Sequence, residues 1–145
     1  MDKQQLEAMI RDIILEKLGG GCTCGAHGVL KSAVPALRTT QADRMDTGNP
    51  RDQVYTHDLF TLEQSPRLGA GLMEMEHTTF PWTLNYDEMD YVIEGELSIL
   101  IGGERITAGP GEVIFIPKGS SIQFSVPGRA RFLYFVYPAD WQNQT

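Results

Sequence analysis

The sequence is poor in cysteine and histidine. Its 145 residues include two cysteines, Cys22 and Cys24, and three histidines, His27, His57 and His77. Cysteines two positions apart are too close to link distant parts of a fold, so we expect no stabilising disulfide, which suits a reducing compartment. The sequence also lacks the closely spaced histidines that a histidine-rich metal centre needs.

Positive charge and long apolar runs are scarce as well. Twelve Lys and Arg residues stand against nineteen Asp and Glu residues, which gives a net charge of −7. A negative surface repels phosphate backbones and anionic lipids, so we expect no nucleic-acid or membrane partner. No apolar run reaches the roughly 20 residues of a membrane span, and the first residues lack a signal-peptide pattern. We therefore expect an intracellular protein.

The first 21 residues predict an amphipathic helix on a flexible tether. Apolar residues recur at helical spacing over residues 2–18, at Leu6, Met9, Ile10, Ile13, Ile14 and Leu18. Three glycines at 19–21 end the helix and leave the chain free to swivel. Such a segment is typical of a docking element, but the helix could also pack on its own domain or on a second subunit.

Residues 22–53 are interpreted as a linker and edge segment. They begin with a glycine-rich loop in which Cys22, Cys24 and His27 form a weak hypothetical metal site without a fourth ligand. The rest of the segment is polar and rich in turn-forming residues.

Residues 54–145 predict an antiparallel jelly-roll barrel. Seven short runs are rich in branched and aromatic residues, at 54–62, 71–77, 89–95, 96–103, 111–117, 121–126 and 131–138. Turns are expected around Gly95, at Gly102–Gly103, around Pro110, at Pro117–Gly119 and at Pro127–Gly128. The fold class is therefore all-β, with one N-terminal helix.

Two spaced motifs in this region resemble those of the cupin superfamily, whose fold is a double-stranded β-helix. They are Glu88-x6-Gly95 and Gly111-x5-Pro117-x-Gly119. The resemblance implies metal-binding histidines at three further positions. Two of them fall on Trp82 and Leu84, or on Pro81 and Thr83, and the third falls on Ile122. Because none of these side chains carries an imidazole, we expect no Fe, Mn, Ni or Zn centre.

Several acids remain as candidate ligands. If Glu88 faces the barrel interior, strand alternation turns Asp90 the same way. Asp87 would lie at the rim, and Glu74 and Glu76 alternate with methionines on another strand. Acids gathered in a barrel need solvent, protons or a cation, which motivates a Mg²⁺ site at Glu88. The alternative is that Glu74, Glu76 and Asp87 face solvent on the outer sheet.

Other side chains complete the predicted site. Glu88, Asp90 and Lys118 are the candidate catalytic residues, with Lys118 as a cation that could meet an anionic substrate. The candidate substrate-binding residues are Trp82, Tyr86, Tyr91, His57, Glu74 and Glu76. His57 and His77 could act as bases or ligands, although a single strand histidine is more often only hydrogen-bonded.

A narrower resemblance covers roughly residues 54–143. The runs FPWTLNYDEMDYVIEGEL, PKGSSIQF and FLYFVYPADWQ are similar to the EutQ family, the cupins of bacterial ethanolamine utilisation. The resemblance implies a cytoplasmic protein of a bacterial microcompartment, acetate kinase activity with Mg²⁺ and ATP/ADP, and docking to shell or cargo proteins through residues 2–18. Cupins by analogy also form homodimers, in which the strand at 131–138 and Trp141 would either form the interface or close the barrel.

The residues themselves show no nucleotide motif. There is no phosphate-binding loop and no arginine cluster, so kinase activity rests on the resemblance alone. The alternative function is a non-catalytic cupin that acts in microcompartment assembly or binds a small metabolite. A metal-dependent oxygenase or isomerase is the third hypothesis.

Overall fold

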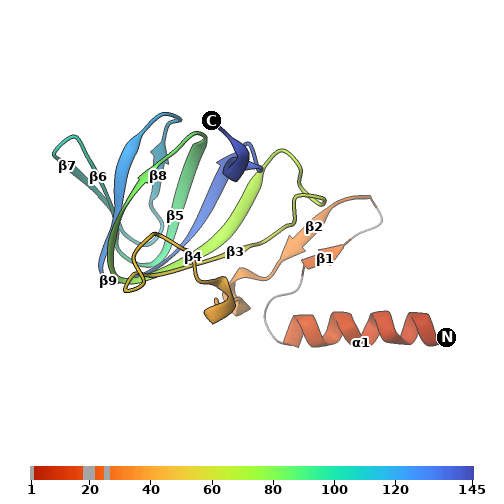
Figure 1. Cartoon of the computed structure of the whole chain (residues 1–145). Helices are drawn as coiled ribbons and strands as arrows, with labels where there is room; N and C mark the ends of the chain where they lie inside the picture. Colours follow the sequence, from red (N-terminus) through yellow and green to blue (C-terminus); the bar gives the residue numbers. More distant parts are fainter. Residues whose placement is uncertain (1, 18–21, 25–26) are drawn as a thin grey trace. The chain divides into compact units, whose positions relative to one another are not determined.

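The computed structural model describes residues 2–17, 22–24 and 27–145, and the side chains of residues 2–10 and 27–145. The chain divides into two compact units, Met1–Arg38 and Thr39–Thr145. Each unit is drawn in Figure 1. The domain limits that the sequence suggests, after residues 21 and 53, stay a prediction.

The N-terminal unit contains the expected helix. Helix α1 spans Lys3–Lys17. It begins at Asp2, whose Oδ1 accepts a hydrogen bond of 2.7 Å from the Gln5 backbone N–H, while the Asp2 N–H donates to Gln5 Oε1. This reciprocal pair satisfies donors at the helix start. The three large apolar side chains described on the helix, Leu6, Met9 and Ile10, are all exposed. The expected tether at 19–21 lies outside the described residues.

The segment after the tether differs from the expected loop. Strand β1 (Cys22–Cys24) pairs antiparallel with β2 (Leu30–Ser32), and a 3-10 turn η1 (Val34–Ala36) follows. Backbone pairing between these short strands, rather than side-chain pattern, forms the hairpin, which is why the sequence did not indicate it.

The second unit is a jelly-roll barrel, which confirms the expected all-β fold. A 3-10 turn η2 (Gln41–Asp43) precedes the strands and another, η3 (Trp141–Asn143), follows them. The strands are β3 (Gln53–Asp58), β4 (Gly69–Thr83), β5 (Asp87–Gly95), β6 (Leu97–Ile101), β7 (Glu104–Ala108), β8 (Val113–Ile116) and β9 (Ser121–Tyr137). All their pairings are antiparallel. Figure 1 shows the β6–β7 hairpin on the side of the barrel away from η3.

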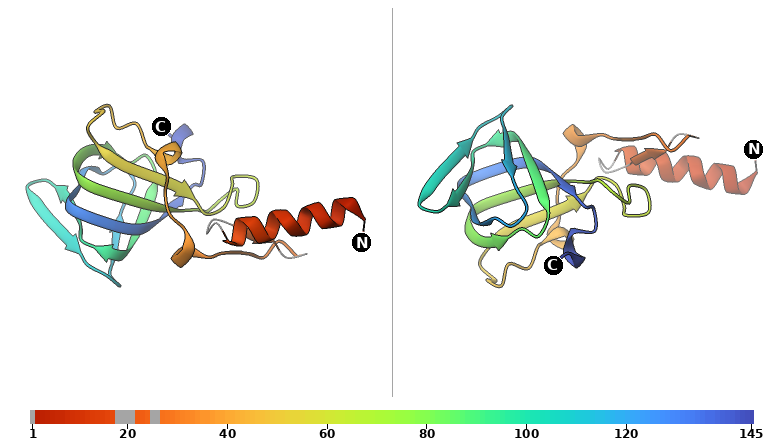
Figure 2. Two further views of the ribbon diagram at one scale, coloured as in Figure 1. Left: turned by 90° about the horizontal axis from the view of Figure 1, so that it is seen from below. Right: turned by 90° about the horizontal axis from the view of Figure 1, so that it is seen from above.

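Two long strands, β4 and β9, belong to both walls of the barrel. The first half of β4 and the second half of β9 lie in the order β3-β4-β9-β5-β8. The second half of β4 and the first half of β9 continue through β6 to β7. Figure 2 shows the two strands side by side as they curve around the barrel. The expected turn at Pro127–Gly128 is therefore wrong, because β9 runs through it.

The corner between the walls lies at His77. The register of β4 against β9 shifts between Glu76 and Thr78, and His77 has a left-handed φ of 47°. Its ring Nδ1 lies 2.7 Å from the carbonyl oxygen of Pro127 on β9, so this nitrogen carries the hydrogen. A bulge of this kind bends the strand and increases its twist. The expected strand at 71–77 therefore continues to Thr83.

The core fills the barrel with inward side chains of both walls. The largest fully buried members include Phe80, Phe132, Met75, Leu84 and Leu97. At Gly71 of β4, the ring of Tyr134 occupies the place that a Cβ would take. None of the helices that the structure describes has the length and apolarity to traverse a lipid bilayer.

Candidate functional site

Two acids of β5 face the barrel interior. Burial alternates along Asp87–Gly95, and Glu88 and Asp90 are 6 % and 0 % exposed. Glu88 lies opposite Ile116 on β8 and Val136 on β9, both of them apolar. Oε2 of Glu88 and both carboxyl oxygens of Asp90 have no hydrogen-bond partner among the described residues. The structure therefore places an acid pair, Glu88 and Asp90, in an apolar interior.

This environment favours the neutral form of the acids. Burial raises the pKa of Glu88 to about 8. Burial, together with the charge of Glu88, raises the pKa of Asp90 well above its usual range. The acid pair therefore holds at least one proton at pH 7 unless a cation binds beside it.

A layer of aromatic side chains covers the acid pair. The indole N–H of Trp82 donates a hydrogen bond of 2.8 Å to the hydroxyl of Tyr86. Trp141, from η3, packs on both rings, with centroid distances of 6.0 Å to Trp82 and 5.4 Å to Tyr86. Burial, followed by the charge of Glu88, raises the pKa of Tyr86, so its hydroxyl keeps its hydrogen.

Two neighbouring cavities share part of this aromatic layer. The inner cavity has a volume of about 30 Å³. Its lining is Met45, Thr56, Met73, Phe80, Trp82, Tyr86, Glu88, Phe124, Tyr134, Val136 and Trp141. The mouth cavity, of about 550 Å³, shares five of these residues and adds polar ones, including Arg44, Asn85 and Gln142. A ligand in the mouth cavity would therefore contact the aromatic layer above the acids.

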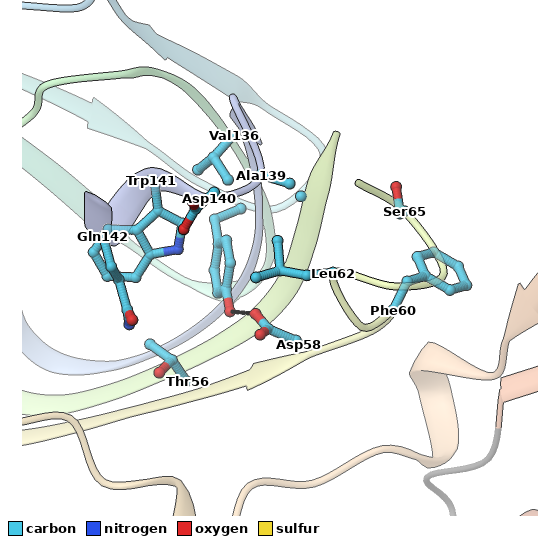
Figure 3. Close-up of a pocket in the computed structure, with 12 residues that line it drawn as sticks. Thr56, Asp58, Phe60, Leu62, Ser65, Val136, Ala139, Asp140, Trp141 and Gln142 are labelled. Carbon is cyan, nitrogen blue, oxygen red and sulfur yellow. Dashed lines mark hydrogen bonds between the residues drawn. The ribbon is translucent and has the colours of Figure 1, made fainter. Parts of the chain in front are cut away.

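A side cavity of about 140 Å³ adjoins the same wall. Figure 3 shows Asp58 and Leu62 on one side of it and Trp141 and Gln142 on the other. The dashed line marks the hydrogen bond of 2.8 Å that the Tyr134 hydroxyl donates to Asp58 Oδ1. Burial, then the charge of Asp58 and this hydrogen bond, raises the pKa of Tyr134. Tyr134 thus lines both the side cavity and the inner cavity.

The positions that hold histidine in metal-dependent cupins are brought together. Trp82 of β4 pairs directly with Ile122 of β9, and Leu84 follows on the inward side with no exposure. Pro81 and Thr83 are exposed. Because Trp82 and Leu84 are the less exposed pair, the structure supports placing the two histidine positions of the first motif at Trp82 and Leu84 rather than at Pro81 and Thr83. Among the side chains that the structure describes, those of residues 2–10 and 27–145, no group of three or more His, Cys, Asp or Glu could hold a metal.

The acid pair fits Mg²⁺ poorly. Its free carboxyl oxygens are the hard ligands that Mg²⁺ prefers, but Mg²⁺ keeps several waters and bridges phosphates. The inner cavity, at about 30 Å³, has room for only about two water-sized groups. A hydrated Mg²⁺ with a phosphate attached does not fit in that space.

Three predicted site residues lie on the outer face instead. Glu74 is 3.3 Å from Arg131 Nη1 and accepts a hydrogen bond from the Thr39 N–H. Glu76 is exposed next to it. His57 Nδ1 lies 2.9 Å from Asp43 Oδ1. Burial would raise the pKa of Asp43, but hydrogen bonds and charge from His57, with hydrogen bonds from Thr40, lower it overall.

The remaining candidates do not line the inner or mouth cavity. Tyr91 alternates outward on β5 and is 39 % exposed. Lys118 is exposed, and its backbone N–H donates to Asp87 Oδ1. His27 is exposed, and the side chains of Cys22 and Cys24 lie outside the described set. His77 forms the strand corner.

Sequence reasoning missed several lining residues. Thr56 and Asp58 reach the cavities from β3, Met45 from the loop before it, and Tyr134 from β9. The alternation of RFLYFVYP could have indicated Tyr134, because it faces the same way as Phe132 and Val136. The sequence left open whether Trp141 forms the dimer interface or closes the barrel. The structure places Trp141 in the lining of the mouth cavity.

A jelly roll with an inward glutamate, Glu88, at the start of the first motif is typical of the cupin fold. A solved cupin superfamily protein from Desulfitobacterium hafniense supports this fold. It has a TM-score of 0.53 and 19% identity, covering 59% of this chain and 78% of that one. The family model of the ethanolamine utilisation protein EutQ matches residues 1–143. The chain therefore belongs to the EutQ family of cupins.

Relatives agree with this assignment. The acetate kinase EutQ of Clostridioides difficile is 54% identical over 151 residues, which cover 99% of this chain and 96% of that one. A solved structure of Clostridium difficile EutQ has a TM-score of 0.84 and 57% identity, covering 88% and 93% of the two chains. The acetate kinase EutQ of Salmonella typhimurium is 51% identical over 100 residues. That match covers 69% of this chain but 43% of the relative.

Proposed function

We propose that this cupin transfers a phosphoryl group between acetyl phosphate and ADP. The observation that carries the proposal is the 54% identity, over 99% of the chain, to a protein named acetate kinase EutQ. In this reaction an oxygen of the ADP β-phosphate attacks the phosphorus of acetyl phosphate. The bond from phosphorus to the acetyl oxygen breaks, and acetate leaves. Such a transfer needs positioning and charge neutralisation more than covalent catalysis.

The mouth cavity is the proposed nucleotide site. Its volume of about 550 Å³ lies within the range of about 300–1,000 Å³ that is typical of ligand sites. Trp82 and Trp141 offer surfaces on which an adenine ring can stack, and Arg44 supplies a positive charge. Mg²⁺ would enter as part of the MgADP substrate. Of the catalytic candidates from the sequence, Glu88 lines the adjoining inner cavity, whereas Asp90 and Lys118 line neither space.

The test is ATP formation from acetyl phosphate and MgADP by the purified full chain. Trp141→Leu removes a stacking surface and should raise KM for ADP by about tenfold or more, because base stacking contributes about 1–3 kcal/mol. Ile106→Ala changes an exposed apolar side chain of β7, away from the mouth cavity and the outer-face apolar surface, and should leave KM unchanged. Absence of turnover by the folded wild-type protein would reject the proposal. An equal KM for both variants would reject the nucleotide site.

A second candidate function is assembly through α1. Leu6, Met9 and Ile10 lie at helical spacing and are each 48 % exposed, which is the pattern of a helix that docks into an apolar groove. We propose a shell or cargo protein of a bacterial microcompartment in the cytoplasm as its partner. Deletion of residues 1–20 should abolish microcompartment localisation and leave the circular dichroism of the barrel intact. Unchanged localisation, or an unfolded truncation, would contradict this role.

We further propose that the barrel forms a homodimer through its outer face. Six apolar side chains of β8, β5 and β9 are 39 to 58 % exposed. They are Val113, Phe115, Met89, Tyr91, Phe135 and Tyr137, and the register places them on neighbouring strands. An exposed apolar surface of this kind marks an interface. Sedimentation should show a dimer that Phe115→Glu converts to a monomer, while the exposed Ile106→Glu on β7 has no effect. A monomeric wild-type chain would exclude the dimer.

A further inference from the structure

The acid pair carries a feature that nucleotide chemistry does not explain. Three carboxyl oxygens of Glu88 and Asp90 are buried without a hydrogen-bond partner among the described residues. Each unsatisfied buried polar group costs about 1–3 kcal/mol. A phosphate would make the cost larger, because it brings further negative charge next to carboxyl groups. A cation that donates hydrogen bonds would remove it.

The surroundings of Glu88 favour an organic cation over a metal ion. Among the described residues that line the inner cavity, Glu88 is the only acid, and none is Lys, Arg or His. Six aromatic rings share that lining, at Phe80, Trp82, Tyr86, Phe124, Tyr134 and Trp141. Aromatic faces attract ammonium groups, and this attraction grows where water is excluded. The Glu88 carboxylate and the aromatic rings that share its cavity form a site for an ammonium ion.

We propose that the inner cavity binds the head group of a small primary ammonium ion. Its N–H groups donate to the carboxyl oxygens of Glu88, and its chain extends along the aromatic layer toward the mouth cavity. The inner cavity, of about 30 Å³, has room for the head group alone. The inner and mouth cavities share five lining residues, so the chain of the bound ion would point toward the mouth cavity. The family description names ethanolamine, whose protonated form has this chemistry.

Binding must release a proton from the acid pair. The titratable groups near Glu88 are Asp90 on the same strand, Tyr86 before it and Tyr134 on β9, with Asp58 of β3 behind Tyr134. Both tyrosines keep their hydrogens, so the proton leaves the carboxyls for the solvent, and the ligand keeps its charge. Because burial raises the pKa of Glu88 to about 8, affinity should fall by up to about tenfold for each pH unit below that value.

The site does not depend on the proposed kinase activity, so binding is measured without nucleotide or Mg²⁺. Ethanolammonium chloride is titrated into the full chain by calorimetry at pH 6 and pH 8, in buffers of different ionisation enthalpy. We expect binding at pH 8, an affinity up to about 100-fold weaker at pH 6, and release of up to one proton per ligand. Ethylene glycol, which is uncharged and of similar size, should not bind.

Glu88→Gln should weaken ethanolammonium binding at pH 8 by tenfold or more and abolish proton release. Glu76→Gln is the matched control, because Glu76 is exposed on the outer face, and it should bind like wild type. The proposal is overturned if Glu88→Gln binds ethanolammonium as tightly as the wild-type chain does, or if ethylene glycol binds the wild-type chain as tightly as ethanolammonium does. It is also overturned if the wild-type chain does not bind ethanolammonium at 100 mM, about the upper practical limit for a weak site. Proton release by the wild-type chain decides the question even if the variant misfolds. Loss of ATP formation alone would leave this result unchanged.

Discussion

The acid pair should make the barrel less stable as the pH rises. Burial raises the pKa of Glu88 in the folded chain to about 8 from its ordinary value of 4.5. A carboxyl whose pKa is higher in the folded state than in the unfolded state binds more protons when the chain is folded. Its contribution to stability is therefore complete below the unfolded-state pKa and is lost as the pH rises through the folded-state pKa. Glu88 alone therefore lowers the free energy of unfolding by up to about 1.4 kcal/mol per pH unit between these values. Asp90 acts in the same direction.

Urea unfolding at pH 5, 6, 7 and 8, followed by tryptophan fluorescence, measures this slope, because Trp82 and Trp141 both report on the barrel. Glu88→Gln should remove up to about 1.4 kcal/mol per pH unit from the slope, since an amide does not titrate in this range. Glu76→Gln should keep the wild-type slope. If Glu88→Gln and wild type lose stability equally between pH 5 and pH 8, Glu88 is not a buried neutral acid and the argument fails.

Two further variants test the walls of the barrel. Arg131→Ala leaves Glu74 largely buried without its closest ion-pair partner and should lower the free energy of unfolding by about 3–5 kcal/mol. The Arg129 side chain is 71% exposed, so Arg129→Ala should lower it by less than about 1 kcal/mol. Chemical denaturation measures both changes. Gly71→Ala should displace the tyrosine ring opposite it on β9 and lower stability by about 1–3 kcal/mol. Gly128 has open space where a Cβ would lie, so Gly128→Ala should change the thermal midpoint little. Equal thermal midpoints for the two variants would contradict the packing at Gly71.

Local patterns predicted the elements that depend on neighbouring residues. The spacing of Leu6, Met9 and Ile10 indicated α1 because a helix repeats within a few residues. The inward position of Glu88 implied that of Asp90 because side chains alternate along a strand. In both cases the information lies within one segment of the chain.

Features that depend on pairing between distant segments could not be predicted. The sequence left Glu74 open between the barrel interior and the outer face, whereas the register places Arg131, 57 residues later, directly opposite it on the outer face. Likewise, the corner at His77 needs the carbonyl of Pro127, and the aromatic layer needs Trp141 to return to the mouth. One sequence contains no record of which distant residues meet, so these parts required the structure.

The position of β9 in the sheets has a consequence for biosynthesis. Strand β9 pairs with β4 along both walls, with β5 in one wall and with β6 in the other, so its pairings link the two walls. During translation, β4 is complete more than 50 residues before its partner has been made. The barrel therefore cannot close until the ribosome has released residue 137, and the earlier strands must be kept from aggregating until then. A chaperone that shields nascent β-strands should accordingly raise the yield of folded protein more than one that acts after release.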